Sequence, residues 1–292
     1  MAKKKGAGNL SKNKYIKSPI NYTGNKYRLL DRILPLFPSG INRFIDLFGG
    51  SGTVLLNVDA ASYVYNDINN YISDLFKELI ITNYDVIIAQ IEEIIFKYDL
   101  SKTNKEGFEK LRNDYNSGKC DKVMDLYVLM CYSFNYQFRF NNNHQYNSSF
   151  GTGRSCFTIR QKNSIASIRD VIKDRMVSCY SLPFEDFADA IHEGDFVYCD
   201  PPYLNSVGNY NDGKRGFEGW NEKHENNLRG LLDYLSSQGI KWALSNNIAY
   251  NRTLKQWAED NQYIIHYLIK DYKTCNYHRK DKDSIEVLIT NY

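Results

Sequence analysis

The 292-residue sequence predicts an α/β fold in which a sheet carries helices on both faces and is interrupted by a mostly helical insertion. Two observations lead to this prediction. Short apolar runs of strand length alternate with helix-length amphipathic stretches at 18–74 and again at 171–292. Residues 75–170 instead contain long helical patterns and one stretch rich in turn residues. Strands that alternate with helices are typical of α/β domains.

The first sheet segment contains a glycine turn in a nucleotide-binding context. The turn Gly49-Gly50-Ser51-Gly52 follows an apolar strand, and Asp67 lies about 20 residues beyond the end of that strand. A strand, a glycine turn, a helix and an acid at this distance are typical of Rossmann-type folds. The predicted elements are a helix at 27–36, a strand at 43–48, a helix at 53–57 and a strand at 63–65.

The insertion is predicted to be helical at 71–99, 101–117 and 121–138, with Ser101 as an N-cap. The stretch 139–164 is dense in Asn, Ser, Gly, Arg and aromatic residues, so we expect a β-hairpin or a long loop there. Beyond the insertion we expect strands at 177–180, 196–199, 240–244, 263–269 and 284–290, and helices near 165–174, 222–237 and 251–260.

Basic residues are concentrated in two parts of the chain, although the net charge is only +3. Residues 1–30 contain eight Lys or Arg and no acid, and residues 101–175 contain thirteen Lys or Arg against seven Asp or Glu. This asymmetry favours one face that meets a polyanion, with surface solvation as the alternative. The first 17 residues hold six lysines and little apolar content, which predicts a flexible basic tail.

The six cysteines form no Cys-x-x-Cys pair, and their spacing suits neither a zinc site nor a disulfide framework. We therefore expect buried thiols in a reducing compartment and no metal. No apolar run reaches membrane-spanning length, and no hydrophobic signal segment follows the basic N-terminus. These features predict a cytoplasmic protein without membrane attachment.

The most informative motif is Asp200-Pro201-Pro202-Tyr203, which follows the apolar run at 196–199. It places a carboxylate, carbonyls without competing N–H groups and an aromatic face around one point at a strand end. That arrangement suits a flat base with an exocyclic amine. The alternative is a proline-rich turn that merely closes the strand.

Four motifs together resemble the Dam family of DNA adenine-N6 methyltransferases, of the α class and nearest to the T-even phage form. They are Tyr-Thr-Gly-Asn-Lys at 22–26, Asp-Leu-Phe-Gly-Gly-Ser-Gly at 46–52, Asn-Asp-Ile-Asn at 66–69 and Asp-Pro-Pro-Tyr at 200–203. The resemblance extends over most of the chain from Asn21 onward, and it implies the cytoplasm of a bacterium or of a phage-infected host. It implies a methyltransferase catalytic domain at 18–74 and 171–292, a DNA target-recognition domain at 75–170, S-adenosyl-L-methionine as cofactor and double-stranded DNA as partner.

The resemblance also implies roles for individual residues. A flipped adenine would be bound by the catalytic residues Asp200, Pro201 and Tyr203. Stacking on Tyr203 and hydrogen bonds to Asp200 and the Pro201 carbonyl would hold its amine, and no covalent enzyme intermediate would form. Cys199 is expected to be a packed thiol. The implied cofactor-binding residues are Tyr22, Lys26, Asp46, Phe48, Gly49, Gly50, Gly52, Asp67, Ile68, Leu182, Phe184 and Asp200.

Sequence recognition is expected from the turn-rich stretch of the insertion. Arg139 falls where the family has an arginine that reads guanine. Gln137 and Ser149 replace residues that are apolar in the family and contact the outer guanine of the site. GATC is therefore the expected recognition sequence, with a different or relaxed outer base as the alternative. The implied DNA-binding residues are Gln137, Arg139, Asn141, Ser149 and Arg154, with Arg160, Lys162, Arg279, Lys280 and Lys282 as further phosphate contacts and 204–221 as a lid.

Three alternatives remain open at this stage. One is methylation of cytosine N4 or of adenine in RNA, and another is a catalytically inactive DNA-binding relative. The third is a dinucleotide oxidoreductase, which the glycine turn permits. We expect the protein to function as a monomer, with a dimer as the alternative.

Overall fold

The computed structural model describes residues 14–120, 123–204, 219–249, 251–268 and 285–292. Most of the predicted tail and lid lies outside these residues, as do Arg279, Lys280, Lys282 and Cys275. No helix within the described ranges is both long enough and apolar enough to cross a bilayer.

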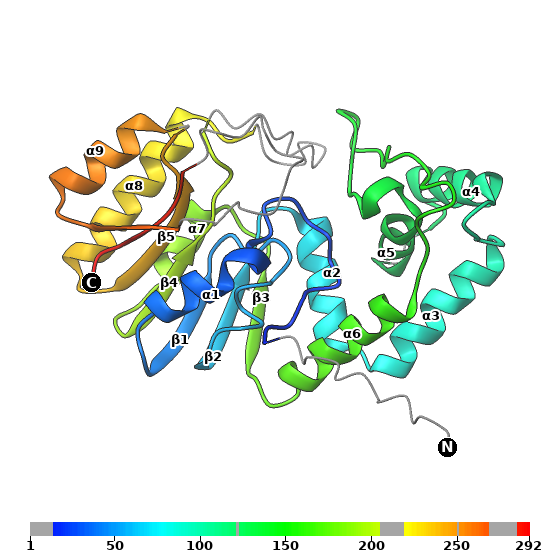
Figure 1. Ribbon diagram of the computed structural model, residues 1–292, viewed down its shortest axis with the longest axis horizontal. Coiled ribbons are helices and arrows are strands. Elements are labelled where there is room, and N and C mark those ends of the chain that lie inside the picture. The colour runs from blue at the N-terminus through cyan, green and yellow to red at the C-terminus, as the bar shows by residue number, and fades with distance from the viewer. Residues whose placement is uncertain (1–13, 121–122, 205–218, 250, 269–284) are drawn as a thin grey trace, which may run out of the picture.

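A seven-stranded mixed sheet in the order β3-β2-β1-β4-β5-β7-β6 forms the centre of the molecule (Figure 1). Neighbouring strands among β1 to β5 are parallel, and β7 is antiparallel to β5 and β6. This arrangement confirms the predicted Rossmann-like α/β fold. The strands are β1 (Ile41–Asp46), β2 (Ala60–Asn66), β3 (Val177–Tyr180), β4 (Asp195–Cys199), β5 (Lys241–Asn247), β6 (Ile264–Tyr267) and β7 (Glu286–Thr290).

Alternate residues of strands β1, β2, β4, β5 and β7 enter two separate cores. In β2, Tyr63 and Tyr65 pack into one core and Val64 into the other, as the two-residue period of a strand requires. Helices α1 (Leu30–Ile33) and α2 (Asn70–Ile81) cover the first face, and α7 (Phe184–Phe187), α8 (Glu222–Ser237) and α9 (Arg252–Asp260) cover the second. Helices therefore lie on both faces, as predicted.

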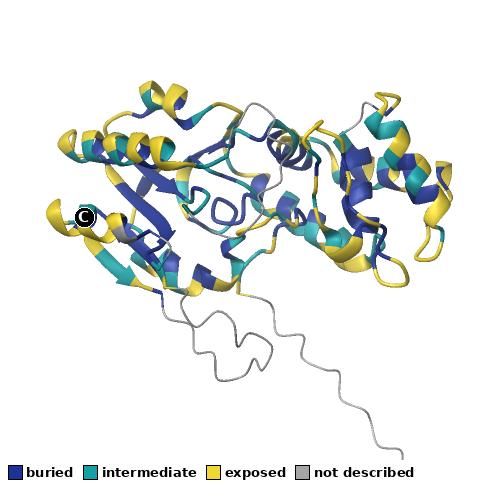
Figure 2. Cartoon of the chain, turned by 90° about the horizontal axis from the view of Figure 1, so that it is seen from above, coloured by how far each residue is buried: buried dark blue, intermediate teal, exposed yellow. Residues whose placement is uncertain are grey.

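The insertion forms a helical part beside the sheet, beyond α2 (Figure 1). Its helices are α3 (Tyr84–Lys97), α4 (Lys105–Asn116), α5 (Val123–Tyr132) and α6 (Ile159–Ile172). Their apolar residues join the core of the first sheet face, so buried segments continue from the sheet into this part (Figure 2). The expected domain boundaries at 75 and 170 fall inside α2 and α6.

The structure corrects the predicted helices of the first half. The expected continuous helix at 71–99 is two helices, because Thr82 is extended and the Asn83 side chain caps α3 by accepting a hydrogen bond from Asp85 N. The cap of α4 is Asn104, not Ser101. Residues 53–57 form turns instead of the expected helix.

The other correction concerns the end of α5 and the stretch that follows. The expected helix at 121–138 ends at Tyr132, and the short 3-10 turn at Phe134–Tyr136 follows it. The predicted hairpin is a minimal one, in which two isolated antiparallel bridges pair the arms, Phe140 with Tyr146 and Ser133 with Phe150. Helix α6 begins at Ile159, earlier than expected, because Thr158 and Gln161 form a capping box.

Candidate active site

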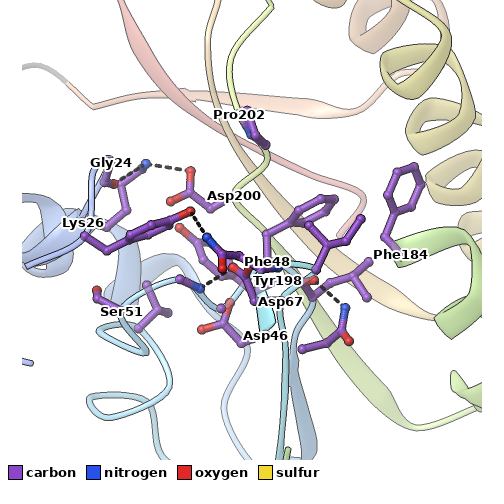
Figure 3. Close-up of a pocket in the computed structure, with 18 of the residues that line it drawn as sticks. Gly24, Lys26, Asp46, Phe48, Ser51, Asp67, Phe184, Tyr198, Asp200 and Pro202 are labelled. Carbon is purple, nitrogen blue, oxygen red and sulfur yellow. Dashed lines mark hydrogen bonds and ion pairs between the residues drawn. The ribbon is translucent and has the colours of Figure 1, made fainter. Parts of the chain in front are cut away.

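A cavity lies where the strand order of the sheet reverses. From β1 the chain proceeds outward through β2 and β3, and β4 then returns to the other side of β1. The carboxyl ends of β1, β2 and β4 place Asp46, Asp67 and Asp200 around a cavity of about 400 Å³ (Figure 3). Ligands of open α/β sheets bind at this switch point, and the volume lies in the range of small-molecule sites.

The cavity collects the predicted cofactor-binding residues with one exception. Gly52 does not line it. A Cβ on Gly52 would lie 2.1 Å from the Phe76 ring, and its φ is +69°, so this glycine is required for close packing and for a left-handed turn. The residues that do line the cavity are Tyr22, Lys26, Asp46, Phe48, Gly49, Gly50, Asp67, Ile68, Leu182, Phe184 and Asp200.

Backbone amides on either side hold the Asp67 carboxylate. Its Oδ2 accepts a hydrogen bond from Gly50 N and its Oδ1 accepts one from Asn69 N, both at 2.8 Å. These bonds fix the carboxylate between the glycine turn and the start of α2. The carboxylate fixed in this way lines the cavity, where a ligand hydroxyl could donate to it.

Asp46 is a buried acid at the end of β1. Its Oδ1 has no hydrogen-bond partner within the described part of the chain. Burial raises the pKa of Asp46 well above its usual value, and the nearby Asp200 and Asp67 raise it further. A cationic group in the cavity would satisfy this oxygen and offset the cost of burying the charge.

Asp200 forms a buried ion pair with Lys26. The Lys26 ammonium lies 2.6 Å from Asp200 Oδ1 and also donates to Gly24 O at 3.0 Å (Figure 3). Burial raises the pKa of Asp200 to about 6, although the attraction and hydrogen bond of Lys26 lower it. The N-terminal motif therefore meets the catalytic motif through these two side chains.

The remaining residues of the catalytic motif have different surroundings. Pro202 lines the cavity, whereas Pro201 is buried and does not. The Tyr203 hydroxyl donates to Glu286 Oε2 at 2.8 Å, and its ring centroid lies 5.1 Å from the Lys26 ammonium. Cys199 is fully buried, and burial raises the pKa of its thiol well above the usual value, which suits a packed thiol.

An aromatic wall closes one side of the cavity. The ring centroids of Phe48, Phe184 and Trp220 lie 5.5 to 5.8 Å from one another. The Trp220 indole N–H donates to the buried Glu225 at 2.8 Å. Sequence reasoning missed Trp220, because its neighbours are polar and nothing local marks it as part of a site.

Two asparagines that sequence reasoning passed over hold the cavity together. Asn66 donates to the carbonyls of Leu47 and Leu182 and accepts from Leu182 N, so it joins the loops after β1 and β3. Asn25 donates to the hydroxyls of Ser51 and Thr53 at 2.8 and 2.7 Å. Asn25 and Asn66 both lie within the four sequence motifs, and this position in a motif was the signal that could have identified them.

The predicted DNA-reading residues lie mainly on one exposed loop. The two arms of this loop are joined by hydrogen bonds from Asn147 N to Arg139 O and from Phe134 N to Ser149 O, each 2.8 Å long. Gln137, Arg139 and Ser149 are thus brought onto neighbouring arms, and all three are exposed.

Of the other two predicted DNA-binding residues, Asn141 lies in the turn that connects these arms and Arg154 lies beyond them. The Asn141 side chain forms the turn at 141–145, where its Oδ1 accepts from Asn143 N and Gln145 N. Arg154 is exposed in the turn that follows Gly151. Across the described residues, no group of three or more His, Cys, Asp or Glu side chains could hold a metal ion.

Comparison with known proteins connects this site to a family. A sequence model described as D12 class N6 adenine-specific DNA methyltransferase matches residues 22–281. Type II methyltransferase M.FokI of Planomicrobium okeanokoites is 44% identical over 99% of this chain and 45% of its own length. Modification methylase StsI of Streptococcus sanguinis is 42% identical over 97% of this chain and 44% of its own length. DNA adenine methylase of Haemophilus influenzae is 26% identical over 63% of both chains. The chain spans less than half the length of the first two relatives.

Proposed function

Because the chain belongs to the D12 class N6 adenine-specific DNA methyltransferases, we propose that it transfers a methyl group from S-adenosyl-L-methionine to N6 of a flipped adenine in duplex DNA. The family membership confirms the resemblance to Dam enzymes and speaks against a dinucleotide oxidoreductase. The observation that carries the proposal is the buried Asp200 carboxylate, which shares one cavity with the acids of the two cofactor motifs.

The residues around the cavity fit the cofactor. Asp46 Oδ1 would accept from its ammonium, the Asp67 carboxylate would accept from its ribose hydroxyls, and Phe48 and Phe184 would enclose its adenine ring. The buried Asp46 and Asp67, with the partly buried Asp200, also suit a ligand that carries positive charge. When bound, the cofactor supplies an electrophilic methyl group.

The catalytic motif would act on the amine of the target base. The Asp200 carboxylate accepts a hydrogen bond from N6–H, and the Pro201 carbonyl accepts from the second hydrogen. Lys26 keeps Asp200 ionised, so that the carboxylate remains an acceptor. Tyr203 offers a ring face for stacking, worth about 1–3 kcal/mol per base. Positioning of the amine and electrostatic stabilisation suffice for direct methyl transfer, so the buried Cys199 is not needed as a nucleophile.

We assign target recognition to the insertion, residues 75–170. Its exposed Gln137, Arg139 and Ser149 lie together, which supports a common surface for reading bases. GATC is the leading site, with the outer base opposite Gln137 left open. Arg154 and Asn141 are the other proposed DNA contacts. We further propose that the protein acts as a monomer, with a dimer as the alternative, and that the reaction takes place in the cytoplasm.

The test is methyl transfer from tritiated S-adenosylmethionine to duplex DNA, single-stranded RNA and no nucleic acid. We expect label in duplex DNA alone. The Asp200→Ala variant should lose transfer by about 100-fold to 1000-fold, comparable to the loss of one essential polar contact in other active sites, while it still binds DNA. Label in RNA alone, or transfer that persists in Asp200→Ala, would contradict the assignment.

A further inference from the structure

A second hollow, of about 390 Å³, lies beside the cofactor cavity. Tyr22 and Thr23 line both hollows, so the N-terminal motif forms part of the wall of each. The opposite wall carries the proposed base-reading residues Gln137 and Arg139. The cofactor motif and the reading segment therefore meet across this hollow.

Asn21 joins the two walls directly. Its side-chain Nδ2 donates to Asn135 O at 3.0 Å and to Tyr136 O at 3.1 Å, across 114 and 115 residues of sequence. Asn135 and Tyr136 have φ values of 54° and 57°. Two successive non-glycine residues in the left-handed region are strained, at a cost of about 1–2 kcal/mol each. The Asn21 amide binds the carbonyls of these two strained residues.

The strained turn sets the direction of the segment that follows it. Gln137 O accepts hydrogen bonds from the Tyr146 hydroxyl at 2.9 Å and from the Ser148 hydroxyl at 2.8 Å. Gln137 is thus held by the hairpin on one side and by the left-handed turn on the other. If the turn relaxes toward negative φ, the path of the chain into Gln137 and Arg139 must change.

We propose that Asn21 is a positioning residue for target recognition. Its amide holds the left-handed turn at Asn135 and Tyr136, and this turn places Gln137 and Arg139 at a defined distance from the cofactor motif. The inference rests on the proposed function. It predicts that loss of Asn21 reduces discrimination between target sequences and leaves cofactor affinity intact.

A pair of variants separates this role from direct contact between Asn21 and DNA. Asn21→Ala removes both hydrogen bonds. Adding Asn135→Gly favours the turn by another means, because glycine adopts positive φ without strain at one of its two left-handed positions, and Asn135 is exposed so little packing is lost. Asn42→Ala is the matched control, because Asn42 is an exposed asparagine near the start of β1, whereas the cavity lies at the carboxyl end of that strand.

The measurement uses duplexes in which the base pairs around one adenine are randomised, with methylation read at each context. The wild-type protein defines the preferred context. We expect Asn21→Ala to lower the ratio of preferred to single-mismatch methylation about tenfold, equivalent to about 1.4 kcal/mol. The double variant should recover to within about threefold of wild type, and Asn42→Ala should match wild type.

Calorimetric binding of S-adenosylmethionine by Asn21→Ala shows whether that variant is folded, and wild-type affinity is expected. An unchanged ratio in Asn21→Ala, or no recovery in the double variant, overturns the inference while the proposed function stands. A wild-type protein that methylates no adenine overturns the proposed function and the inference with it.

Discussion

Replacement of Lys26 by methionine tests how Asp200 is kept ionised. The Lys26 ammonium lies 2.6 Å from Asp200 Oδ1, and the two side chains are 7% and 17% exposed, so water screens the pair little. Asp200 has a pKa of about 6 with Lys26 in place. An adjacent cation lowers a carboxyl pKa by about 1–3 units, so methionine at position 26 should raise the pKa of Asp200 by that amount.

The change in activity follows from the ionised fraction. With a pKa of about 6, about nine in ten Asp200 groups are ionised at neutral pH. A rise of about 1–3 units leaves between about one in two and about one in a hundred ionised. Methyl transfer at neutral pH should therefore fall by about twofold to about 100-fold, and recover as the pH rises through the new pKa.

Single-turnover transfer at saturating S-adenosylmethionine, measured across the pH range, isolates this effect from changes in cofactor affinity. The wild-type acid limb should have its midpoint near pH 6. Lys26→Arg retains the positive charge and should keep the limb near its wild-type position, and Lys255→Met, at a half-exposed position of α9, is the surface control. An acid limb in Lys26→Met at the wild-type position would refute the reasoning.

Three further predictions concern the cavity and its supports. Asp46→Asn should weaken S-adenosylmethionine binding about tenfold to 100-fold by calorimetry, since a charged hydrogen bond is worth about 1.5–3 kcal/mol. Because the pKa of Asp46 is raised in the folded state, Asp46 stabilises the fold at low pH, and this stabilisation is lost as the pH rises through the folded-state pKa. The Asp46→Asn variant should therefore have a higher melting temperature than wild type in cofactor-free alkaline buffer. Gly52→Ala, whose Cβ would meet Phe76, should lower the free energy of unfolding by about 2–4 kcal/mol, against about 1 kcal/mol for Gly118→Ala, which has positive φ and open space. Cys199→Ala should keep methyl transfer within about threefold of wild type, because the thiol is buried and only packing changes; near-complete loss would show that Cys199 takes part in the reaction.

The local signals of the sequence predicted the sheet, and they predicted most of the residues that the fold gathers around the cavity. The glycine turn and Asp67 required little tertiary information, because a strand end, a tight turn and an acid at a set distance are specified by adjacent residues. Trp220 and Asn66 could be placed at the cavity only with tertiary information. Their roles depend on partners such as Glu225 and Leu182 that are brought near only by the folded sheet.

Element boundaries in the insertion were predicted less well. Asn83 breaks an apolar pattern that would suit one long helix, because its side chain caps α3. Asn135 and Tyr136 end the helical pattern after α5 with positive φ, which non-glycine residues adopt only when tertiary contacts compensate. Asn21 supplies two of those contacts from a distant part of the chain, and no local pattern signals such a bond.

The central claim is that the Asp200 site methylates the exocyclic amine of adenine in duplex DNA. Mass spectrometry of nucleosides from duplex DNA, treated with the protein and isotopically labelled S-adenosylmethionine, tests it most directly. The account predicts labelled N6-methyladenine as the modified nucleoside and its loss in Asp200→Ala. Labelled N4-methylcytosine, or labelled N6-methyladenine that persists in Asp200→Ala, would contradict it.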